Sequence, residues 1–207
     1  MKHVRIFAAI NLSVASIRKL AELQADLRQS QAPDLKARWV PPANLHVTVK
    51  FYGELAPEQV VAVTDAAREA TEGLRPFAVT AKGLGVFPDA NEPRVIWVGL
   101  NDGADALTTL RDRLEQASEQ RGFPADPRPF RPHLTVGRVK RGNAGVDHWL
   151  QQHAETDCLI STVEELVIYE SRLRREGAEY VAHARLPLGS PVAAAPPQPT
   201  PREEEST

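Results

Sequence analysis

Apolar and polar positions recur along the chain with two different periods, and these periods predict strands that alternate with helices. A short apolar run at residues 3–10 predicts a strand. Residues 45–52 alternate between apolar and polar side chains, which is typical of a half-buried strand. Between these strands a helix is predicted from the apolar positions Ile17, Leu20, Leu23 and Leu27. The chain therefore opens with a strand, a helix and a second strand.

A similar order of elements returns in the rest of the chain. Pro57 stands where a helix over residues 60–70 begins, since proline is tolerated in a first helical turn. A later amphipathic helix carries Leu107, Leu110 and Leu114, and a proline-rich turn follows it. The other predicted elements are strands at residues 77–86, 94–100, 133–139, 163–171 and 178–188 and a short helix at residues 146–153. The two halves of the chain therefore follow variations of one plan.

Residues 1–188 are expected to form a single domain or two tightly fused lobes, and residues 189–207 a disordered tail. A chain of 207 residues buries a sufficient core without a disulfide or a metal. The tail contains five prolines and no aromatic residue, and acidic residues gather near its end. It therefore lacks the apolar area that offsets the entropy cost of ordering it.

Charge and cysteine content exclude several classes of protein. The 25 basic and 27 acidic residues give a net charge of −2, which argues against a protein that coats nucleic acid through non-specific phosphate contacts. Cys158 is the only cysteine, which excludes a disulfide framework and a thiolate zinc site and indicates a reducing setting. The first twelve residues have neither the length of a membrane span nor a small-residue cleavage site. We therefore expect a cytoplasmic protein without a membrane segment, in which any contact with RNA is local.

Two of the predicted strands contain the same His-x-Thr motif between aliphatic residues. Because side chains alternate across a strand, each motif places its histidine and its threonine on one face and its aliphatic residues on the other. By that rule the polar faces carry His46, Thr48, Lys50 and Tyr52 in the first motif and His133, Thr135 and Gly137 in the second. Gly137 would leave room on this face for a ligand.

Paired histidines and threonines suit attack on a phosphodiester. Imidazole titrates near neutral pH, so a neutral ring takes a proton from water while a charged ring gives one to the leaving oxygen. A threonine hydroxyl donates a hydrogen bond to a non-bridging phosphate oxygen. A lone His-x-Thr is more often structural, but two copies that each open a predicted strand favour catalysis. This chemistry uses no metal or other cofactor, and we expect none.

The flanks of both motifs resemble a known family. The segments that carry the likeness are Arg5-Ile6-Phe7-Ala8-Ala9-Ile10, Trp39-Val40, Asn44-Leu45-His46, Phe51-Tyr52-Gly53-Glu54 and Phe130-Arg131-Pro132-His133-Leu134-Thr135-Val136-Gly137-Arg138. They resemble the bacterial and archaeal RNA 2′,3′-cyclic phosphodiesterases, once named 2′-5′ RNA ligases, of the two-histidine phosphoesterase superfamily. The likeness runs from about Val4 to Leu188. The chain departs from the family's pattern, which usually has leucine or isoleucine, at Val47, Val49, Tyr52 and Val136.

This resemblance implies an α+β fold that is bilobal and pseudo-symmetric, in which two antiparallel sheets flanked by helices enclose a central cleft. It also implies hydrolysis of RNA 2′,3′-cyclic phosphodiester ends to 2′-phosphomonoesters, with reversible 2′-5′ RNA ligation. Carried over to this chain, His46 donates a proton to the departing 3′ oxygen and His133 accepts one from water. Thr48 and Thr135 bind the phosphate. The expected partner is an RNA 3′ end with a cyclic phosphate, for example of a tRNA fragment, and a monomer is expected.

Further side chains are candidates for substrate binding. Arg131 offers a fork of donors to an anion, or alternatively holds the proline-rich turn. Lys50 is its counterpart in the first motif, and Tyr52 would influence which nucleotide fits. Phe7 and Trp39 are candidates to stack on a terminal base, although such aromatics more often belong to the core. Positive charge would gather at one mouth of the cleft through Arg128, Arg138, Lys140 and Arg141.

Two other functions are compatible with the same motifs. A phosphodiesterase for ADP-ribose 1″,2″-cyclic phosphate or for 2′-5′ linked oligonucleotides would use the same fold and the same site. A non-catalytic module that binds RNA ends would instead show an incomplete histidine pair or a blocked phosphate pocket. Both motifs are intact in the sequence, so we expect an enzyme.

Overall fold

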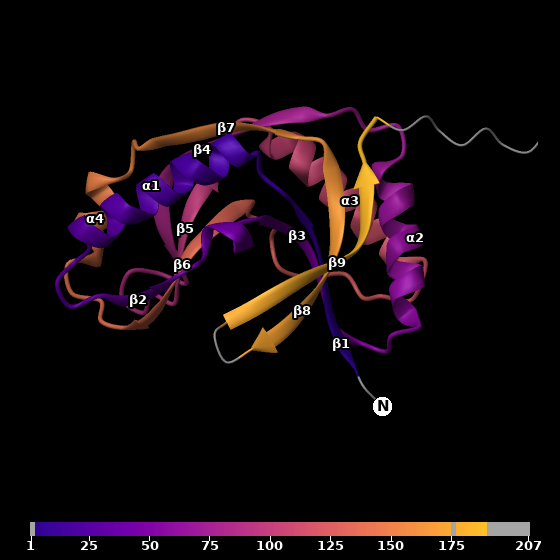
Figure 1. Cartoon of the computed structure of the whole chain (residues 1–207), viewed down its shortest axis with the longest axis horizontal. Coiled ribbons are helices and arrows are strands. Elements are labelled where there is room, and N and C mark those ends of the chain that lie inside the picture. The colour runs from indigo at the N-terminus through magenta and orange to yellow at the C-terminus, as the bar shows by residue number, and fades with distance from the viewer. Residues whose placement is uncertain (1–2, 175–176, 190–207) are drawn as a thin grey trace, which may run out of the picture.

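The chain folds into a curled antiparallel sheet with helices on its outer sides (Figure 1). The computed structural model describes residues 3–174 and 177–189, and within them nine strands form one sheet. The strand order is β7-β4-β5-β6-β3-β1-β8-β9, and β2 pairs with β6 beside this path. The strands are β1 (Val4–Ile10), β2 (Lys36–Trp39), β3 (Val47–Leu55), β4 (Phe77–Phe87), β5 (Val95–Leu100), β6 (His133–Arg141), β7 (Asp157–Val163), β8 (Glu165–Arg174) and β9 (Gly177–Pro187). The helices are α1 (Val14–Ser30), α2 (Gln59–Thr71), α3 (Ala104–Glu119) and α4 (Val146–Gln152), with a 3-10 turn η1 (Pro42–Asn44).

The sheet divides into two lobes between the strands that carry the two motifs. A single Cα pair, Val47 with Leu134, joins β3 to β6. We name the part with β2, β4, β5, β6 and β7 the His133 lobe and the part with β1, β3, β8 and β9 the His46 lobe. The predicted α+β fold with antiparallel sheets is confirmed, and the two expected sheets are continuous through this junction.

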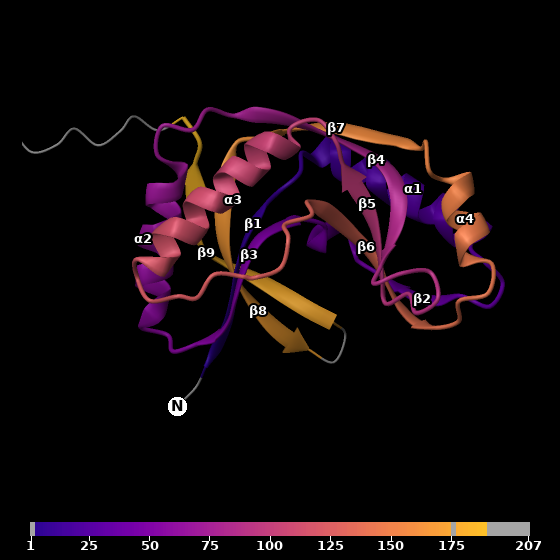
Figure 2. The same cartoon turned by 180° about the vertical axis from the view of Figure 1, so that it is seen from behind.

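Helices cover the outer side of each lobe, as the two opposite views show (Figures 1 and 2). α1 and α4 lie beside the His133 lobe, whereas α2 and α3 pack together on the His46 lobe. α1 begins after Ser13, whose hydroxyl accepts a hydrogen bond from the amide of Ser16. The buried amide of Gln24 donates to the carbonyls of Val40 and Val136. This side chain ties α1 to both β6 and the segment that precedes the first motif.

Each lobe combines elements from distant parts of the chain. β1 belongs to the His46 lobe, after which the chain crosses to the His133 lobe for α1 and β2 and returns for β3 and α2. It crosses again for β4 and β5, places α3 against β3, and then adds β6, α4 and β7 to the His133 lobe. The hairpin of β8 and β9 completes the His46 lobe beside β1. The lobes are therefore not the N-terminal and C-terminal halves of the chain.

Two strands form that the apolar pattern does not predict. β2 has only four residues, and it forms because it pairs with the edge of β6. β7 is likewise defined by its pairing along β4. The predicted hairpin is present as β8 and β9. Apart from Gly189, the predicted tail lies outside the described residues. Over residues 3–174 and 177–189, no helix is long and apolar enough to cross a membrane.

Candidate active site

His46 and His133 line the same cleft, which has a volume of about 1060 Å³ and is lined by residues of both lobes. Thr48 and Thr135 line it with them. His46 directly precedes β3 and His133 is the first residue of β6, the two strands that meet at the junction between the lobes. The fold therefore brings together the four side chains that the two motifs single out.

Both imidazole rings are oriented in the same way. Nδ1 of His46 lies 2.8 Å from the carbonyl oxygen of Asn44, and Nδ1 of His133 lies 2.7 Å from that of Arg131. A carbonyl oxygen only accepts hydrogen bonds, so Nδ1 of each ring carries a proton in the neutral and in the charged form. Nε2 is therefore the nitrogen that gains or loses a proton in both rings.

The two Nε2 atoms differ in their partners. Nε2 of His46 lies 3.1 Å from Oγ1 of Thr48, whose hydroxyl donates to it when the ring is neutral. For Nε2 of His133 the described part of the chain provides no hydrogen-bond partner, and the ring is only partly buried. His133 is therefore the ring whose reactive nitrogen is open to a small molecule such as water.

Burial lowers the pKa of both histidines. The His46 ring lies 5.1 Å from the ring of Phe7 and 5.2 Å from that of Tyr180, and the His133 ring lies 5.0 Å from the ring of Phe87. Removal from water disfavours the charged imidazole and is the largest cause that lowers each pKa below 6.5. The hydrogen bonds from Nδ1 to the carbonyls act in the opposite direction and are weaker than burial.

Arg138 lowers the pKa of both rings further through its positive charge. His133 adds to the same effect on His46. Both rings are therefore mainly neutral in the ligand-free protein at neutral pH. An anionic phosphodiester in the cleft would favour the charged form and so restore a proton to one of them.

A bulge in β3 reverses the alternation of side chains after the first motif. Thr48 and Lys50 pair with adjacent residues of β1, so Val49 is the extra residue of β3. Beyond it Phe51, and not Lys50, lies on the side of the histidine. Phe51 stacks on Phe7 at a centroid distance of 5.5 Å, is 45% exposed and lines the cleft.

A second bulge occupies the equivalent place in β6. Thr135 and Gly137 pair with adjacent residues of β5, so Val136 is the extra residue. Gly137 consequently points into the core, where an added Cβ would lie 3.3 Å from Cδ1 of Ile96. The expectation that Gly137 leaves room for a ligand is wrong. Arg138 lines the cleft instead.

Lys50 does not offer its amine to the cleft, which corrects the role that strand alternation gave it. Its side chain is 1% exposed and forms an ion pair with Glu115 of α3, and Nζ donates to the carbonyl of Pro124 at 3.0 Å. Nε of Arg111 lies 3.4 Å from Oε1 of Glu115, and its Nη2 donates to the carbonyl of Asp126 at 3.1 Å. These buried charges hold the segment that leads into β6.

Two of the three aromatic candidates, Tyr52 and Trp39, are not part of the cleft lining. The hydroxyl of Tyr52 lies 2.8 Å from Oγ of Ser118 on α3, and burial raises the pKa of Tyr52 to about 12. Phe7 borders the cleft, but it is 1% exposed and supports the His46 ring. Trp39 faces α1, where the guanidinium of Arg28 lies 5.6 Å from its ring centroid. The positions of Tyr52 and Trp39 do not fit the predicted contact with substrate, whereas the stacking role of Phe7 stays a prediction.

Sequence reasoning misses two aromatic residues of the cleft. Alternation assigns Phe51 to the core, because no feature of the sequence marks the bulge at Val49. Tyr180 on β9 meets the edge of the His46 ring, although the two residues are far apart along the chain. Only the pairing of β9 with β8 and of β8 with β1 brings Tyr180 to the site.

The cleft is basic although the chain is nearly neutral. Arg131 lines it as predicted, with an exposed side chain. The arginines in its wall are Arg5, Arg94, Arg111, Arg128, Arg131 and Arg138. Its acidic residues, Glu115 and Asp126, are both engaged, and hydrogen bonds from Arg128 hold the pKa of Asp126 at about 2. In the part of the chain that the structure describes, no group of three or more His, Cys, Asp or Glu side chains is placed to hold a metal ion.

The chain is similar to a family of known proteins over most of its length. Residues 12–97 and residues 98–180 each match the family described as LigT-like phosphoesterase. An RNA 2′,3′-cyclic phosphodiesterase of Aquifex aeolicus is 32% identical over 193 residues, which are 91% of this chain and 100% of that protein. One of Archaeoglobus fulgidus is 30% identical over 177 residues, covering 86% of this chain and 96% of the relative.

Solved structures share the fold. A crystal structure of a Thermus thermophilus protein has a TM-score of 0.73 at 25% identity and covers 89% of this chain and 97% of that one. A crystal structure of E. coli LigT complexed with 3′-AMP has a TM-score of 0.72 at 24% identity and covers 91% and 99%. The separate matches to the two halves of the sequence agree with the equivalent bulges in β3 and β6.

Proposed function

The chain belongs to the LigT-like phosphoesterase family, and on this premise we propose that it hydrolyses RNA 2′,3′-cyclic phosphodiester ends to 2′-phosphomonoesters. The curated relatives carry the name RNA 2′,3′-cyclic phosphodiesterase, which supports hydrolysis of a cyclic phosphodiester. Reversible 2′-5′ ligation is part of the proposal, because hydrolysis and ligation share one phosphoryl transfer run with different acceptors. Action as a monomer in the cytoplasm is also proposed.

One observation carries the proposal. Two histidines face one cleft with the same tautomer, because a carbonyl two residues earlier fixes the Nδ1 proton of each. Each ring therefore reaches the cleft with the nitrogen that exchanges protons. Attack of water at phosphorus requires one such nitrogen to accept a proton and another to donate one.

We assign the base role to His133 and the acid role to His46. Water attacks the phosphorus and loses a proton to Nε2 of His133, which the described residues leave open. The bond from phosphorus to the 3′ oxygen breaks, and Nε2 of charged His46 gives its proton to that oxygen. The product carries the phosphate on the 2′ oxygen, and a proton exchange with solvent resets the two rings.

Hydrogen-bond donors around the cleft would hold the phosphate during this step. Thr48 and Thr135 are placed to donate to its non-bridging oxygens, one from each lobe. Arg131 and Arg138 supply charge that does not move when the reaction proceeds. Phe51 offers an exposed ring beside the His46 side of the site, where a base would stack.

The experiment that tests this function uses an RNA oligonucleotide with a terminal 2′,3′-cyclic phosphate, incubated with the protein and a chelator. Phosphorus NMR should show conversion of the cyclic phosphate into a 2′-phosphomonoester. A 3′-phosphate product would contradict the assignment of the leaving oxygen, and an unreacted cyclic phosphate would contradict the function.

Two alternatives share part of this site. ADP-ribose 1″,2″-cyclic phosphate and 2′-5′ linked oligonucleotides would react through the same residues, and a substrate panel ranked by kcat/KM separates them from RNA ends. A module that only binds RNA ends requires an incomplete histidine pair or a blocked pocket. Both histidines line an open cleft in the described structure, which supports an enzyme.

A further inference from the structure

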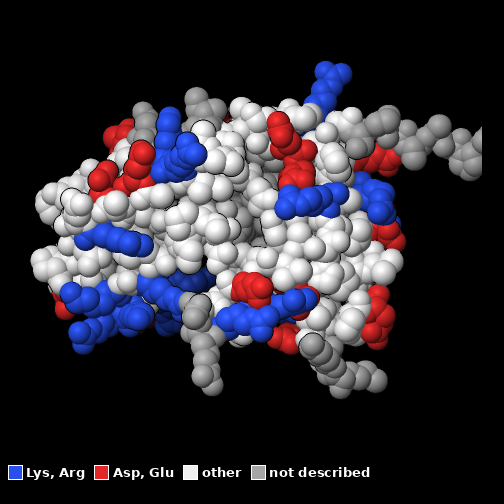
Figure 3. All heavy atoms as spheres, viewed as in Figure 1, with Lys and Arg blue, Asp and Glu red and all other residues white. Residues whose placement is uncertain are grey.

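A row of basic side chains continues from the cleft along the paired strands β2 and β6. We name the four residues of this row, Lys36, Arg38, Arg138 and Arg141, the basic strip. All four are exposed, and residues 36–41 and 133–142 contain no acidic residue. Figure 3 shows Lys and Arg side chains gathered over β2 and β6, in the lower left of the view. This local charge contrasts with the net charge of −2 of the whole chain.

Strand register places the basic strip on the inner face of the His133 lobe. Trp39 points toward α1 on the outer side, so Lys36 and Arg38 point to the opposite face. Arg138 is the Cα partner of Arg38, and Arg141 is the partner of Lys36. Directly paired residues of neighbouring strands share a face. The strip thus lies on the same face as Arg138, which lines the cleft.

The basic strip contains two opposed pairs of like charges. Arg38 stands opposite Arg138, and Lys36 stands opposite Arg141. Like charges in directly opposed positions destabilise a sheet. Within residues 3–174 and 177–189, no ion pair joins Lys36, Arg138 or Arg141 to an acidic side chain. An external anion that lies across Lys36 and Arg141 would relieve the repulsion of that pair.

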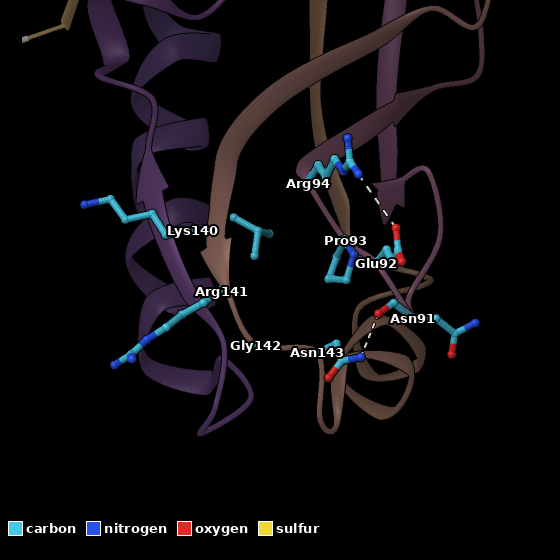
Figure 4. Close-up of a pocket in the computed structure, with 9 residues that line it drawn as sticks. Asn91, Glu92, Pro93, Arg94, Lys140, Arg141, Gly142 and Asn143 are labelled. Atoms are coloured by element: carbon cyan, nitrogen blue, oxygen red, sulfur yellow. Dashed lines mark hydrogen bonds and ion pairs between the residues drawn. The ribbon is translucent and has the colours of Figure 1, made fainter.

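The strip lies on an open surface and borders a crevice that Arg141 helps to line. A crevice of about 330 Å³ separates the turn between β4 and β5 from the end of β6. Lys140 and Arg141 belong to the lining of this crevice, and in Figure 4 their side chains extend away from its opposite wall. On its other side Glu92 lies 3.7 Å from Arg94, and the amide of Asn143 donates to the carbonyl of Asn91. An open charged surface suits a chain that runs across it better than an enclosed small molecule.

We propose that the basic strip binds the RNA backbone of the nucleotides that precede the cyclic phosphate. This inference rests on the proposed function, since it extends the substrate outward from the histidines. Arg141 lies three residues beyond Arg138 on β6, a step of about 10 Å along a strand. The far end of the strip is therefore placed for the phosphates of neighbouring nucleotides and not for the reacting phosphate. Contacts of this kind are independent of base sequence.

The test is a binding measurement with a double variant, Lys36→Gln/Arg141→Gln. This change removes one opposed pair and leaves both motifs and Arg138 in place. Fluorescence anisotropy of a labelled RNA oligonucleotide with a 3′-phosphate, at several salt concentrations, should show roughly tenfold weaker binding. The salt dependence should fall by about 0.7 in log Kd per log salt for each lost contact with a single strand. Affinity for a 2′,3′-cyclic mononucleotide should not change.

A matched control distinguishes an effect of the basic strip from an effect of the net charge of the protein. Arg18→Gln/Lys19→Gln on α1 makes the same change in net charge through two exposed residues on the outer side of the lobe. This control should bind the oligonucleotide as the unmodified protein does. The strip variant should also be at least as stable to heat, because a repulsive pair is lost.

An unchanged RNA affinity in the strip variant, or an equal loss in the α1 control, would overturn the proposal. An equal loss for the cyclic mononucleotide would do the same. Because the assay measures binding and not turnover, failure of the proposed function is distinguishable from failure of the proposed RNA contact. RNA that depends on the strip for binding but is never hydrolysed would contradict the function alone.

Discussion

Phe51 and Arg138 occupy equivalent positions in the two halves of the site. Each follows its cleft threonine by three residues, and in each strand a bulge directly after the threonine brings that position to the cleft. The halves thus share geometry but differ in chemistry, with an exposed aromatic ring on the His46 side and a guanidinium on the His133 side. The two pseudo-symmetric halves of the fold therefore line the cleft with different side chains. This difference suits a substrate that has a base on only one side of its phosphate.

Replacement of Phe51 tests the aromatic side of this asymmetry. Phe51→Ala should raise the KM for cyclic-phosphate RNA roughly tenfold or more with a smaller effect on kcat, because base stacking contributes about 1–3 kcal/mol per base. Phe51→Trp should retain a low KM. Steady-state kinetics on one oligonucleotide measures both variants. Leu173→Ala, which trims another exposed apolar side chain of the same cleft, is the control. An unchanged KM in Phe51→Ala would exclude the stacking role.

Arg138 should set the pH dependence of the reaction. Both histidine pKa values lie below 6.5, so activity falls on the acid side as the base gains a proton and on the alkaline side as the acid loses one. The maximum of kcat/KM should therefore lie below pH 6.5, and that of kcat at a higher pH, because bound phosphodiester favours the charged ring.

Arg138→Gln removes a charge that lowers both pKa values, so both limbs of the kcat/KM profile should move to higher pH. Lys19→Gln, an exposed position on α1, should leave the profile in place. Values of kcat/KM measured across a pH series for both variants test this prediction. A profile without a descending alkaline limb would show that no histidine acts as an acid.

The sequence predicts the strands of the motifs well and the side chains around them less well. Alternation of strong apolar residues marks β3 and β6, and their histidines and threonines lie before the bulges, so their shared face is predicted correctly. Beyond the bulges the same alternation assigns Lys50 and Tyr52 to the cleft and Phe51 to the core, which is the reverse of the structure. A bulge depends on the register with a neighbouring strand, and that information is not local.

Other misses have the same origin. Nothing in the short segment of β2 predicts a strand, because its stability comes from the edge of β6. Tyr180 reaches His46 only through the order of strands in the sheet. Local periodicity predicts the elements, whereas pairing between distant strands decides which side chains meet.

Replacement of Lys50 should lower the stability of the fold more directly than it weakens substrate binding. Lys50→Met leaves Glu115 buried without its closest cation, and breaking a buried pair costs about 3–5 kcal/mol of unfolding free energy. The double variant Lys50→Met/Glu115→Met should recover most of that loss, because both charges are removed together. Urea unfolding measures both. Arg68→Met, which breaks an exposed pair with Asp65, should cost less than about 1 kcal/mol.

If Lys50→Met were as stable as the unmodified protein, the buried pair would not hold the segment before β6. If the double variant recovered stability but not turnover, the bond from Lys50 to the carbonyl of Pro124 would be shown to position the site. Full recovery of both properties would show that the pair has a structural role only.

The central claim is that two histidines from opposite lobes act together on one cyclic phosphate. The measurement that tests it most directly is the turnover of RNA 2′,3′-cyclic phosphate by His46→Ala and His133→Ala, each checked for folding by circular dichroism. His148→Ala, on the exposed face of α4, serves as the control and should keep full activity. We predict that each active-site variant loses roughly 10²- to 10⁴-fold in kcat, the usual contribution of a positioned acid or base. Near-normal turnover by either folded variant would contradict the account.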